Sequence, residues 1–375
     1  MKIIYVENVR IPSERAHAYQ IVQACDWFAR LRHEVVLVNP DRAGGKDVFA
    51  AYGLVHGIFR HETLKVTDPL SWKWFHLKKL AYVWQRFSFS RALKSWAKNQ
   101  KADVWYTRDP AMVDVLGNED RKFVLELHDR PDSNPARWER IKSLVRNYVV
   151  ISNGLKQALQ SLGIEESRIC VAPDGYDPKD FENPGERVSE RKKLGIPDDA
   201  FVAIYTGGFY KWKGIDLVVR SWKRTDERAH LVLIGGPDGD RLRLESLVDP
   251  SVASRIHIFP MMDHAAAIRT LAAADVGLLT SSKEHEIGRM FTSPLKQFEY
   301  LAAGLPILAS EVPSSHEILT DEVAAFYEPN EVGFAAALKG IQSNQGWRAS
   351  ASAKSRELVV PYTWEARART IVSVL

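Results

Sequence analysis

The most constraining feature of this sequence is a regular alternation between short β-rich runs and longer amphipathic stretches. Lys2–Val6 is β-branched and aromatic and contains no breaker, which predicts a first strand. Ser13–Arg32 follows with apolar residues at roughly helical spacing, and His33–Val38 then predicts a second strand. Strands that alternate with helices imply parallel sheets that are covered on both faces.

The same alternation continues along the chain. Further strands are predicted at Val104–Thr107, Phe123–His128, Tyr148–Ser152, Ile169–Ala172, Phe201–Thr206, His230–Ile234, Ile256–Phe259, Val276–Thr280 and Pro306–Ser310. These strands are too many for one open sheet of ordinary size, so two sheets are expected. The length of 375 residues also favours two domains or more, at about 150 residues per domain.

Residues 173–198 have the composition of a linker, because prolines and glycines gather there among charged residues. The sequence therefore predicts two doubly wound α/β domains, over residues 1–180 and 190–357, that face a cleft. In such sheets ligands bind outside the carboxyl ends of the strands.

Composition excludes several classes of protein. With 45% hydrophobic and 26% charged residues, the chain is neither collagen-like nor disordered. Cys25 and Cys170 are too few for a disulfide framework or a structural zinc site, which points to a reducing compartment such as the cytoplasm. No apolar run approaches the roughly 18–20 residues of a membrane span, and Glu7 interrupts the opening apolar stretch too early for a signal peptide.

The strongest functional signal is a short predicted helix with an exposed N-terminus. Ser293 is a good N-cap, Pro294 suits the first helical position, and Gly304 suits the C′ stop. Free backbone N–H groups at such an N-terminus suit a diphosphate. Lys296 adds positive charge, and Glu299 could accept hydrogen bonds from a ribose diol. A capped surface helix without a function would show the same pattern.

A glycine turn follows the predicted strand at 201–206. Gly207 and Gly208 allow close approach of the backbone to a ligand, and Lys211 and Lys213 can neutralise phosphate oxygens. The spacing of a Walker loop is absent. A tight turn with solvated lysines is the alternative interpretation.

Polar residues gather at the carboxyl ends of two predicted strands in the first half. His128, Asp129 and Arg130 follow one strand, and Arg108 and Asp109 follow the strand before it. His128 could hydrogen-bond a substrate hydroxyl or, if protonated, support developing negative charge. The alternative is a histidine that is satisfied by a neighbouring carbonyl group.

The other motifs considered do not indicate a function. Asp238-Gly-Asp240 is a DxD pattern of the kind that holds a metal ion in other enzymes, but it follows glycines and a proline in an expected turn. The sequence contains no GxGxxG after its first strand, no HExxH and no GxSxG. No metal ligand is therefore predicted.

Taken in order, these segments resemble the retaining glycosyltransferases of family 4, the glycogen-synthase-like group with the GT-B fold. The resemblance covers nearly the whole chain and rests on the order and spacing of several modest matches. They are Ala16–Val35, Val149–Leu155, Val171–Asp177, Lys213-Gly214, Asp275–Gly277, Ser293–Lys296, Glu299-Tyr300, Ala303–Pro306 and Tyr362–Glu365. The resemblance implies an acceptor-binding Rossmann-like domain over 1–180 and a donor-binding one over 190–357. It also implies a C-terminal helix within 358–375 that packs back on the first domain.

The implied activity is a metal-independent, retaining transfer from a nucleoside diphosphate sugar to a glycan or lipid-linked acceptor, without a cofactor. Lys213 would hold the diphosphate, Glu299 the donor ribose, and His128 the donor sugar near its reacting carbon, which makes these three the predicted catalytic residues. The other predicted donor contacts are Gly207, Gly208, Lys211, Met261, Arg289, Ser293, Pro294, Leu295 and Lys296. The predicted acceptor contacts are Arg108, Asp109, Asp129 and Arg130.

The sequence departs from the family pattern at three places. Phe291 stands where the family often has a glutamate that contacts sugar hydroxyls, and Gly208 stands where a basic residue is common. Residues 10–15 replace the family's glycine-rich turn. Arg289, Lys211, Glu284 or Glu286 are candidates to replace the missing donor contacts. Two other functions stay open: a sugar-nucleotide epimerase with a similar pair of domains, and an inactive scaffold.

The net charge of +4 hides an uneven distribution. No acidic residue lies between Asp68 and Asp103. The basic and aromatic residues of that stretch are Lys73, Lys78, Lys79, Arg86, Arg91, Lys94, Lys98 and Lys101, and Trp72, Trp74, Phe75, Tyr82, Trp84, Phe87, Phe89 and Trp96. Residues 72–98 therefore suggest a segment that lies on an anionic membrane surface, with the enzyme peripheral on the inner face of the cytoplasmic membrane. The alternative is a basic helix that grips an anionic acceptor. No motif supports nucleic-acid binding.

Overall fold

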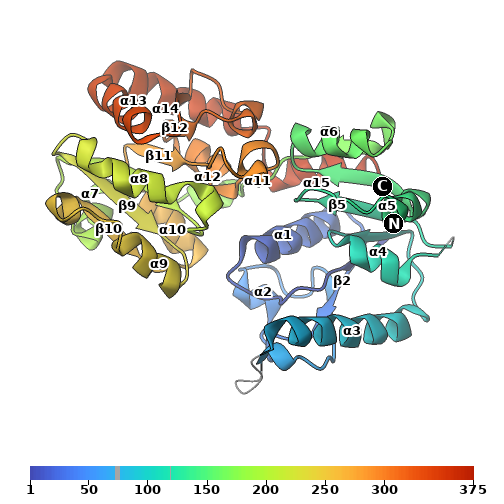
Figure 1. Cartoon of the computed structure of the whole chain (residues 1–375). Helices are drawn as coiled ribbons and strands as arrows, with labels where there is room; N and C mark the ends of the chain where they lie inside the picture. The colour runs from blue at the N-terminus through green and yellow to red at the C-terminus, as the bar shows by residue number, and fades with distance from the viewer. Residues whose placement is uncertain (72–76, 119) are drawn as a thin grey trace. The chain divides into compact units, whose positions relative to one another are not determined.

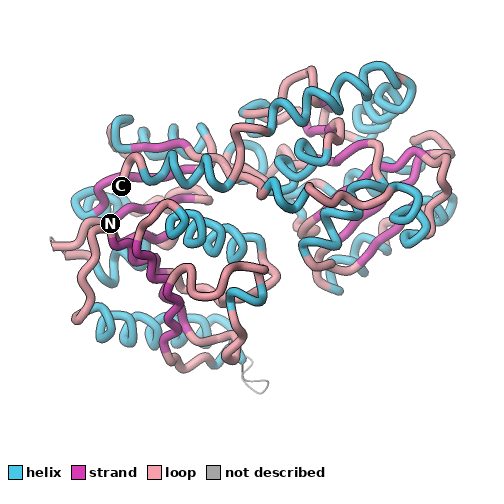
Figure 2. The backbone as a smooth tube through the Cα atoms, turned by 180° about the vertical axis from the view of Figure 1, so that it is seen from behind, coloured by secondary structure: helices cyan, strands magenta, loops and turns pink. Residues whose placement is uncertain are grey.

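The computed structural model describes residues 1–71, 77–118 and 120–375, which divide into two compact units. Unit 1 comprises Met1–Pro173 and Trp364–Leu375, and unit 2 comprises Asp174–Thr363. In each unit, helices cover both faces of a parallel sheet (Figures 1 and 2). The chain enters unit 2 at Asp174, so most of the stretch with linker composition belongs to unit 2. There, Arg187–Leu194 forms helix α7.

Unit 1 is built on a seven-stranded sheet in the order β3-β2-β1-β4-β5-β6-β7. Its strands are β1 (Lys2–Val6), β2 (Glu34–Pro40), β3 (Arg60–Leu64), β4 (Val104–Thr107), β5 (Phe123–Leu127), β6 (Val145–Val150) and β7 (Ile169–Val171). Its helices are α1 (Ala16–Arg30), α2 (Val48–Ala51), α3 (Lys78–Ala97), α4 (Pro110–Leu116), α5 (Pro135–Leu144), α6 (Asn153–Ser161) and α15 (Trp364–Val372). The strand order reverses between β1 and β4, which opens a crevice at their carboxyl ends.

Unit 2 has a six-stranded sheet in the order β10-β9-β8-β11-β12-β13. Its strands are β8 (Phe201–Thr206), β9 (Ala229–Ile234), β10 (Ile256–Phe259), β11 (Val276–Leu279), β12 (Ile307–Ser310) and β13 (Ala324–Tyr327). Besides α7, its helices are α8 (Ile215–Ser221), α9 (Asp238–Glu245), α10 (His264–Thr270), α11 (Glu286–Met290), α12 (Leu295–Ala303), α13 (Glu331–Ser343) and α14 (Gln345–Val359). The reversal lies between β8 and β11, so both units have the same kind of switch point.

The two faces of each sheet bury alternate residues of the same strand. In β8, Val202 and Ile204 pack with residues of α7, α12 and α14, while Ala203 and Tyr205 pack with residues of α8 and α13. A parallel strand that is covered on both sides has no polar face, which explains why β8 is buried throughout.

The sequence missed β3 and β13, and both lie at an edge of their sheet. The β3 sequence, Arg60-His-Glu-Thr-Leu64, has one apolar residue, and β13 is only four residues long. Edge strands need less apolar surface because one side is not paired. The polar composition of β3 therefore has a physical cause, whereas β13 is short but apolar throughout.

The last helix, α15, begins at Trp364 and belongs to unit 1, where it packs against α1. Arg367 of α15 pairs with Glu126 at the end of β5, with 2.7 Å between Nη2 and Oε1. Among the described residues, no helix has both the length and the apolar content that a membrane span requires.

Candidate functional sites at the two switch points

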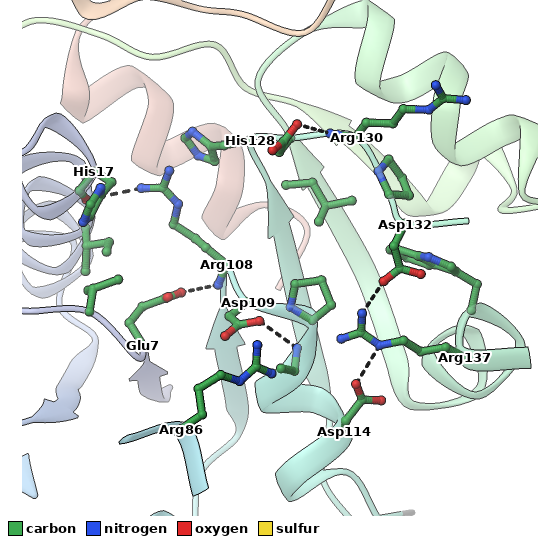
Figure 3. Close-up of a pocket in the computed structure, with 18 residues that line it drawn as sticks. Glu7, His17, Arg86, Arg108, Asp109, Asp114, His128, Arg130, Asp132 and Arg137 are labelled. Atoms are coloured by element: carbon green, nitrogen blue, oxygen red, sulfur yellow. Dashed lines mark hydrogen bonds and ion pairs between the residues drawn. The ribbon is translucent and has the colours of Figure 1, made fainter. Parts of the chain in front are cut away.

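Unit 1 has a pocket of about 510 Å³ at the carboxyl ends of β1, β4 and β5 (Figure 3). Its charged lining combines four arginines with several carboxylates and two histidines. These residues are Arg86, Arg108, Arg130, Arg137, Glu7, Asp109, Asp114, Asp129, Asp132, His17 and His128. Such a lining offers many donors and acceptors to a polyhydroxylated ligand.

Arg108, a predicted acceptor contact, is held in place by the surrounding unit. Its guanidinium donates to the carbonyl oxygen of His17 at 3.3 Å and to Oε1 of Gln20 at 3.1 Å. Its Nε also lies 4.0 Å from Oε1 of Glu126. Burial and the Arg108 charge lower the pKa of the His17 side chain to about 4. These contacts hold the Arg108 guanidinium in one position. The His17 side chain is neutral near pH 7 because its pKa is low.

His128 is bound to a buried carboxylate. Its Nε2 contacts Oε1 of Glu126, which also accepts from Arg367, and the second Glu126 oxygen accepts from the Tyr106 hydroxyl. Burial and Arg108 lower the pKa of His128 to about 3, against the opposing effect of Glu126. Although burial opposes ionisation of Glu126, Arg367 and the other partners hold the pKa of Glu126 well below its usual value. His128 is thus neutral near pH 7, which leaves it a hydrogen-bonding role rather than that of a cation.

Glu7 directly follows β1 and is 3% exposed. Its carboxyl group accepts from the backbone N–H of Arg108, which joins the ends of β1 and β4 across the switch point. Burial raises the pKa of Glu7 to about 8, although Arg108 acts in the opposite direction. Near pH 7 this side chain is therefore protonated and can also donate a hydrogen bond.

The other predicted acceptor contacts line the same pocket with different local roles. Asp109 caps α4, with its Oδ1 accepting from the N–H of Ala111 at 2.8 Å. Asp129 and Arg130 are exposed, and Oδ1 of Asp129 accepts from the N–H of Arg130 at 2.8 Å. The structure thus brings all four predicted acceptor contacts to one pocket.

In unit 2, two lysines lie beside the glycine turn that follows β8. Gly207 has a φ of 119°, and a Cβ there would lie 3.3 Å from Nζ of Lys296. Lys296 is 8% exposed, and its Nζ lies over the Tyr205 ring, 3.1 Å from the centroid. Within the part of the chain that the structure describes, this ammonium group has no hydrogen-bond partner.

Both lysines lose hydration, since Lys296 is buried and Lys213 is half-buried. Burial and the neighbouring Lys213 lower the pKa of Lys296 well below the usual lysine value. Burial also lowers the pKa of Lys213 to about 7. The Lys213 ammonium group lies over the Trp212 ring, 3.8 Å from its centroid. A buried ammonium group without a carboxylate partner is costly, so this pair is suited to receive an anion.

Glu299 lies one turn further along α12, and its side chain is 16% exposed. His264 lies between two carboxylates, with Nε2 at 2.9 Å from Asp180 and Nδ1 at 3.8 Å from Glu299. Burial alone would lower the pKa of His264, but the hydrogen bond to Asp180 and the charge of Glu299 raise it. Burial raises the pKa of Glu299, opposed by His264 and Lys296. Histidine and carboxylate therefore stabilise each other.

The start of α12 differs from the prediction. The helix begins at Leu295 with Pro294 in the cap position, and no side chain caps it. The prediction that Ser293 is the N-cap is wrong, because its Oγ accepts instead from the N–H of Asp174 at 3.0 Å. This contact joins residues that are far apart in sequence, and it fixes the loop before α12. Gly304 ends the helix with a φ of 71°, as predicted.

The remaining predicted donor contacts are less constrained. Gly208 leaves room for the Tyr210 ring, which would lie 2.7 Å from a Cβ at that position. Lys211, Met261 and Arg289 are exposed. Phe291, at the place of the family glutamate, is buried, and Glu284 and Glu286 are both exposed.

The expected turn at the DxD pattern is instead the first turn of α9. Asp238 pairs with Arg241 at 2.7 Å, and Asp240 lies 3.6 Å from Arg243. Across residues 1–71, 77–118 and 120–375, no group of three or more His, Cys, Asp or Glu side chains could hold a metal ion.

Several residues of the two sites were not predicted from the sequence. Glu7 was noticed only because it ends an apolar run, and its position after a strand was the available signal. Glu126 lies inside a strand, while Asp180 and His264 lie in separate segments of unit 2, with no motif to connect them. Arg86 lies on a helix whose basic character had been noticed as a whole.

Comparison with known proteins identifies both units. Residues 18–180 match the model of "Glycosyltransferase Family 4", and residues 200–344 match "Glycosyl transferases group 1". A D-inositol 3-phosphate glycosyltransferase of Geodermatophilus obscurus is 25% identical over 293 residues, or 72% of this chain and 62% of that protein. One of Xylanimonas cellulosilytica is 26% identical over 225 residues, or 56% of this chain and 52% of that protein. The chain thus spans less than two thirds of the length of these relatives.

Solved structures share the fold across the whole chain. A sucrose-phosphate synthase from Thermosynechococcus elongatus has a TM-score of 0.80 at 18% identity, covering 100% of this chain and 98% of that one. Anabaena HepE in complex with UDP-glucose has a TM-score of 0.75 at 15% identity, covering 100% of both chains. The fold is therefore GT-B. Because the two family models together match most of its residues, the chain belongs to glycosyltransferase family 4.

Proposed function

We propose that this protein transfers a sugar from a nucleoside diphosphate sugar to a hydroxyl group of a glycan or lipid-linked acceptor. The observation that carries the proposal is the desolvated pair Lys213 and Lys296 beside Gly207, at the switch point of unit 2. A diphosphate would satisfy both ammonium groups, and Glu299 would accept hydrogen bonds from the ribose. HepE, which has the same fold, binds UDP and UDP-glucose.

In the proposed reaction the bond between the anomeric carbon and the diphosphate oxygen breaks. The acceptor oxygen bonds to the same face of that carbon, so the configuration is retained, and the acceptor proton passes to the leaving diphosphate. Lys213 and Lys296 stabilise the negative charge that develops on the diphosphate. Because two ammonium groups supply this positive charge, the transfer is proposed to need no metal ion.

The pocket of unit 1 is the proposed acceptor site. Arg108 has a fixed charge, and neutral His128 and protonated Glu7 can hydrogen-bond hydroxyl groups. The free cysteines Cys25 and Cys170 agree with a reducing compartment such as the cytoplasm.

Two substitutions test the donor site. Lys213→Ala and Glu299→Ala are each expected to lower transfer by roughly a hundredfold or more, because each removes an interaction with the donor. Thermal-shift measurements with UDP, GDP and ADP would first identify the base, and release of the free diphosphate upon addition of acceptor would then measure transfer. Lys339→Ala, which changes an exposed lysine of the same unit, is the matched control.

Wild-type activity in both variants would contradict the assignment, as would the absence of any shift with all three diphosphates. Transfer should also continue in excess EDTA, and its loss there would contradict metal independence. If NMR showed a product of inverted anomeric configuration, the retaining mechanism would be contradicted, but the proposed sugar transfer would not.

A further inference from the structure

Helix α3 of unit 1 is apolar on two opposite sides. Its inner side places Phe89, Leu93 and Ala97 among the buried residues. On the opposite side, Leu80, Val83, Trp84 and Phe87 are between 58% and 68% exposed. Their spacing of three, four and seven residues puts them in one stripe along the helix. Packing within unit 1 accounts for the inner side only.

The exposed apolar residues are concentrated on this element. Of the fourteen large hydrophobic side chains that are exposed among the described residues, six lie between residues 77 and 87. Some of the aromatic residues that the sequence suggested for this surface have other roles. Phe89 is buried, and Nε1 of Trp96 donates to Glu62. Trp72, Lys73, Trp74 and Phe75 lie outside the described residues.

The same stripe becomes cationic in the second half of the helix. Arg91, Lys94 and Lys98 follow Phe87 at intervals of four, three and four residues, and all three are exposed. Lys78 and Lys79 lie in the first turn, which has no acidic residue. Cations at a helix N-terminus oppose the helix dipole, so they weaken the helix locally. Helix stability therefore does not explain Lys78 and Lys79, whereas Lys94 and Lys98 lie at the C-terminal end, where cations are favourable.

We propose that the outer stripe of α3 docks on the surface of an anionic lipid bilayer. The apolar half, Leu80–Phe87, would enter the boundary between headgroups and acyl chains, and Arg91, Lys94 and Lys98 would contact the anionic headgroups. The absence of acidic residues between Asp68 and Asp103 makes the segment complementary to a negative surface. A symmetric contact between two copies would bring like charges together, which disfavours a second copy as the occupant. In Figure 1, α3 runs along one side of unit 1.

Vesicle co-sedimentation of the full chain tests this proposal. Wild-type protein is expected to sediment with vesicles of equimolar phosphatidylglycerol and phosphatidylcholine and to stay in solution with phosphatidylcholine alone. The triple variant Arg91→Gln/Lys94→Gln/Lys98→Gln should lower partitioning by roughly fivefold per charge removed, hence about a hundredfold in total. Trp84→Ser/Phe87→Ser should weaken binding at high salt as well as low, because its effect is not electrostatic.

Matched variants on unit 2 serve as controls. Lys192→Gln/Lys339→Gln/Lys354→Gln removes three exposed lysines, and Leu242→Ser/Val332→Ser removes two exposed apolar side chains, each 65% exposed in the native protein. Both controls should bind like the wild type, and circular dichroism should show unchanged folding in all variants. Equal binding to neutral vesicles, or equal losses in the control variants, would overturn the proposal. Concentration-dependent dimerisation that the stripe variants abolish, without vesicle binding, would assign the stripe to a second copy.

Discussion

The two switch points of this protein have the same sheet topology and opposite electrostatic designs. In unit 1, the charged side chains around β1, β4 and β5 pair with one another, as Glu126 does with Arg367 and His128. In unit 2, the ammonium group of Lys296 lies against Gly207 and that of Lys213 lies over the Trp212 ring, and neither is paired with a carboxylate among the described residues.

This difference indicates how each site is prepared for its ligand. A network of paired charges holds neutral and charged groups in fixed positions, which suits recognition of hydroxyl groups in a defined geometry. A desolvated pair of lysines is costly without an anion, and its charge is stabilised when one binds. Removal of one charged side chain should therefore have a different consequence in each unit. It should lower the stability of unit 1, and it should weaken ligand binding in unit 2.

The largest expected effect is on the stability of unit 1. Glu126→Ala removes the shared partner of Arg367, His128 and Tyr106, and leaves a buried arginine without its carboxylate. Breaking a buried pair in this way costs about 3–5 kcal/mol. Urea denaturation followed by circular dichroism would measure the loss.

Glu139→Ala is the control for that measurement. Its side chain is 72% exposed and pairs with Lys142 at the surface of α5, so a change of less than about 1 kcal/mol is expected. If Glu126→Ala were no more destabilising than Glu139→Ala, the paired network would not support unit 1, and the contrast between the sites would fail.

The complementary experiment in unit 2 is Lys296→Met. Methionine fills a similar volume and can rest on the Tyr205 ring, so a loss of stability beyond about 1.5 kcal/mol is not expected. The lost charged hydrogen bond should weaken binding of the nucleoside diphosphate by roughly tenfold to a hundredfold. Isothermal titration with the diphosphate found in the thermal-shift series would measure this. Unchanged affinity, with Lys339→Met as the reference, would exclude a diphosphate contact for Lys296.

The sequence predicted both sheets because buried parallel strands are apolar along their whole length, as β8 is. It missed edge strands such as β3, whose residues need not be apolar. At the start of α12 the local signals favoured Ser293 as the cap, but a contact with Asp174 takes its hydroxyl group. Local propensity cannot report a partner that the fold brings from 119 residues away.

The charge states of the site residues could not be predicted from the sequence either. Lys296 was predicted to lie at a helix N-terminus, but only the packing of α12 against Gly207 and Tyr205 shows that it is desolvated. Glu7 becomes part of a site because β1 and β4 are neighbours in the sheet, which places its carboxyl group against the backbone of Arg108. Residue types were predictable from the motifs, whereas charge states depend on contacts between segments.

The smallest expected effect, when taken for a change of one pH unit, concerns the pH dependence of the stability of unit 1 through Glu7. Its pKa rises from an ordinary value near 4.5 to about 8 on folding, so the folded state holds a proton that the unfolded state releases between these values. Stability from this group is complete below about pH 4.5 and falls as the pH rises toward 8, by up to about 1.4 kcal/mol per pH unit. Glu7→Gln keeps an acceptor for the Arg108 N–H but does not ionise. Its stability relative to the wild type should therefore increase with pH across this window, measured as denaturation midpoints at matched ionic strength. If the stability difference between wild type and variant were constant with pH, Glu7 would be ionised in the folded protein. Of the two neutral groups proposed to bind hydroxyl groups in the acceptor pocket, only His128 would then remain.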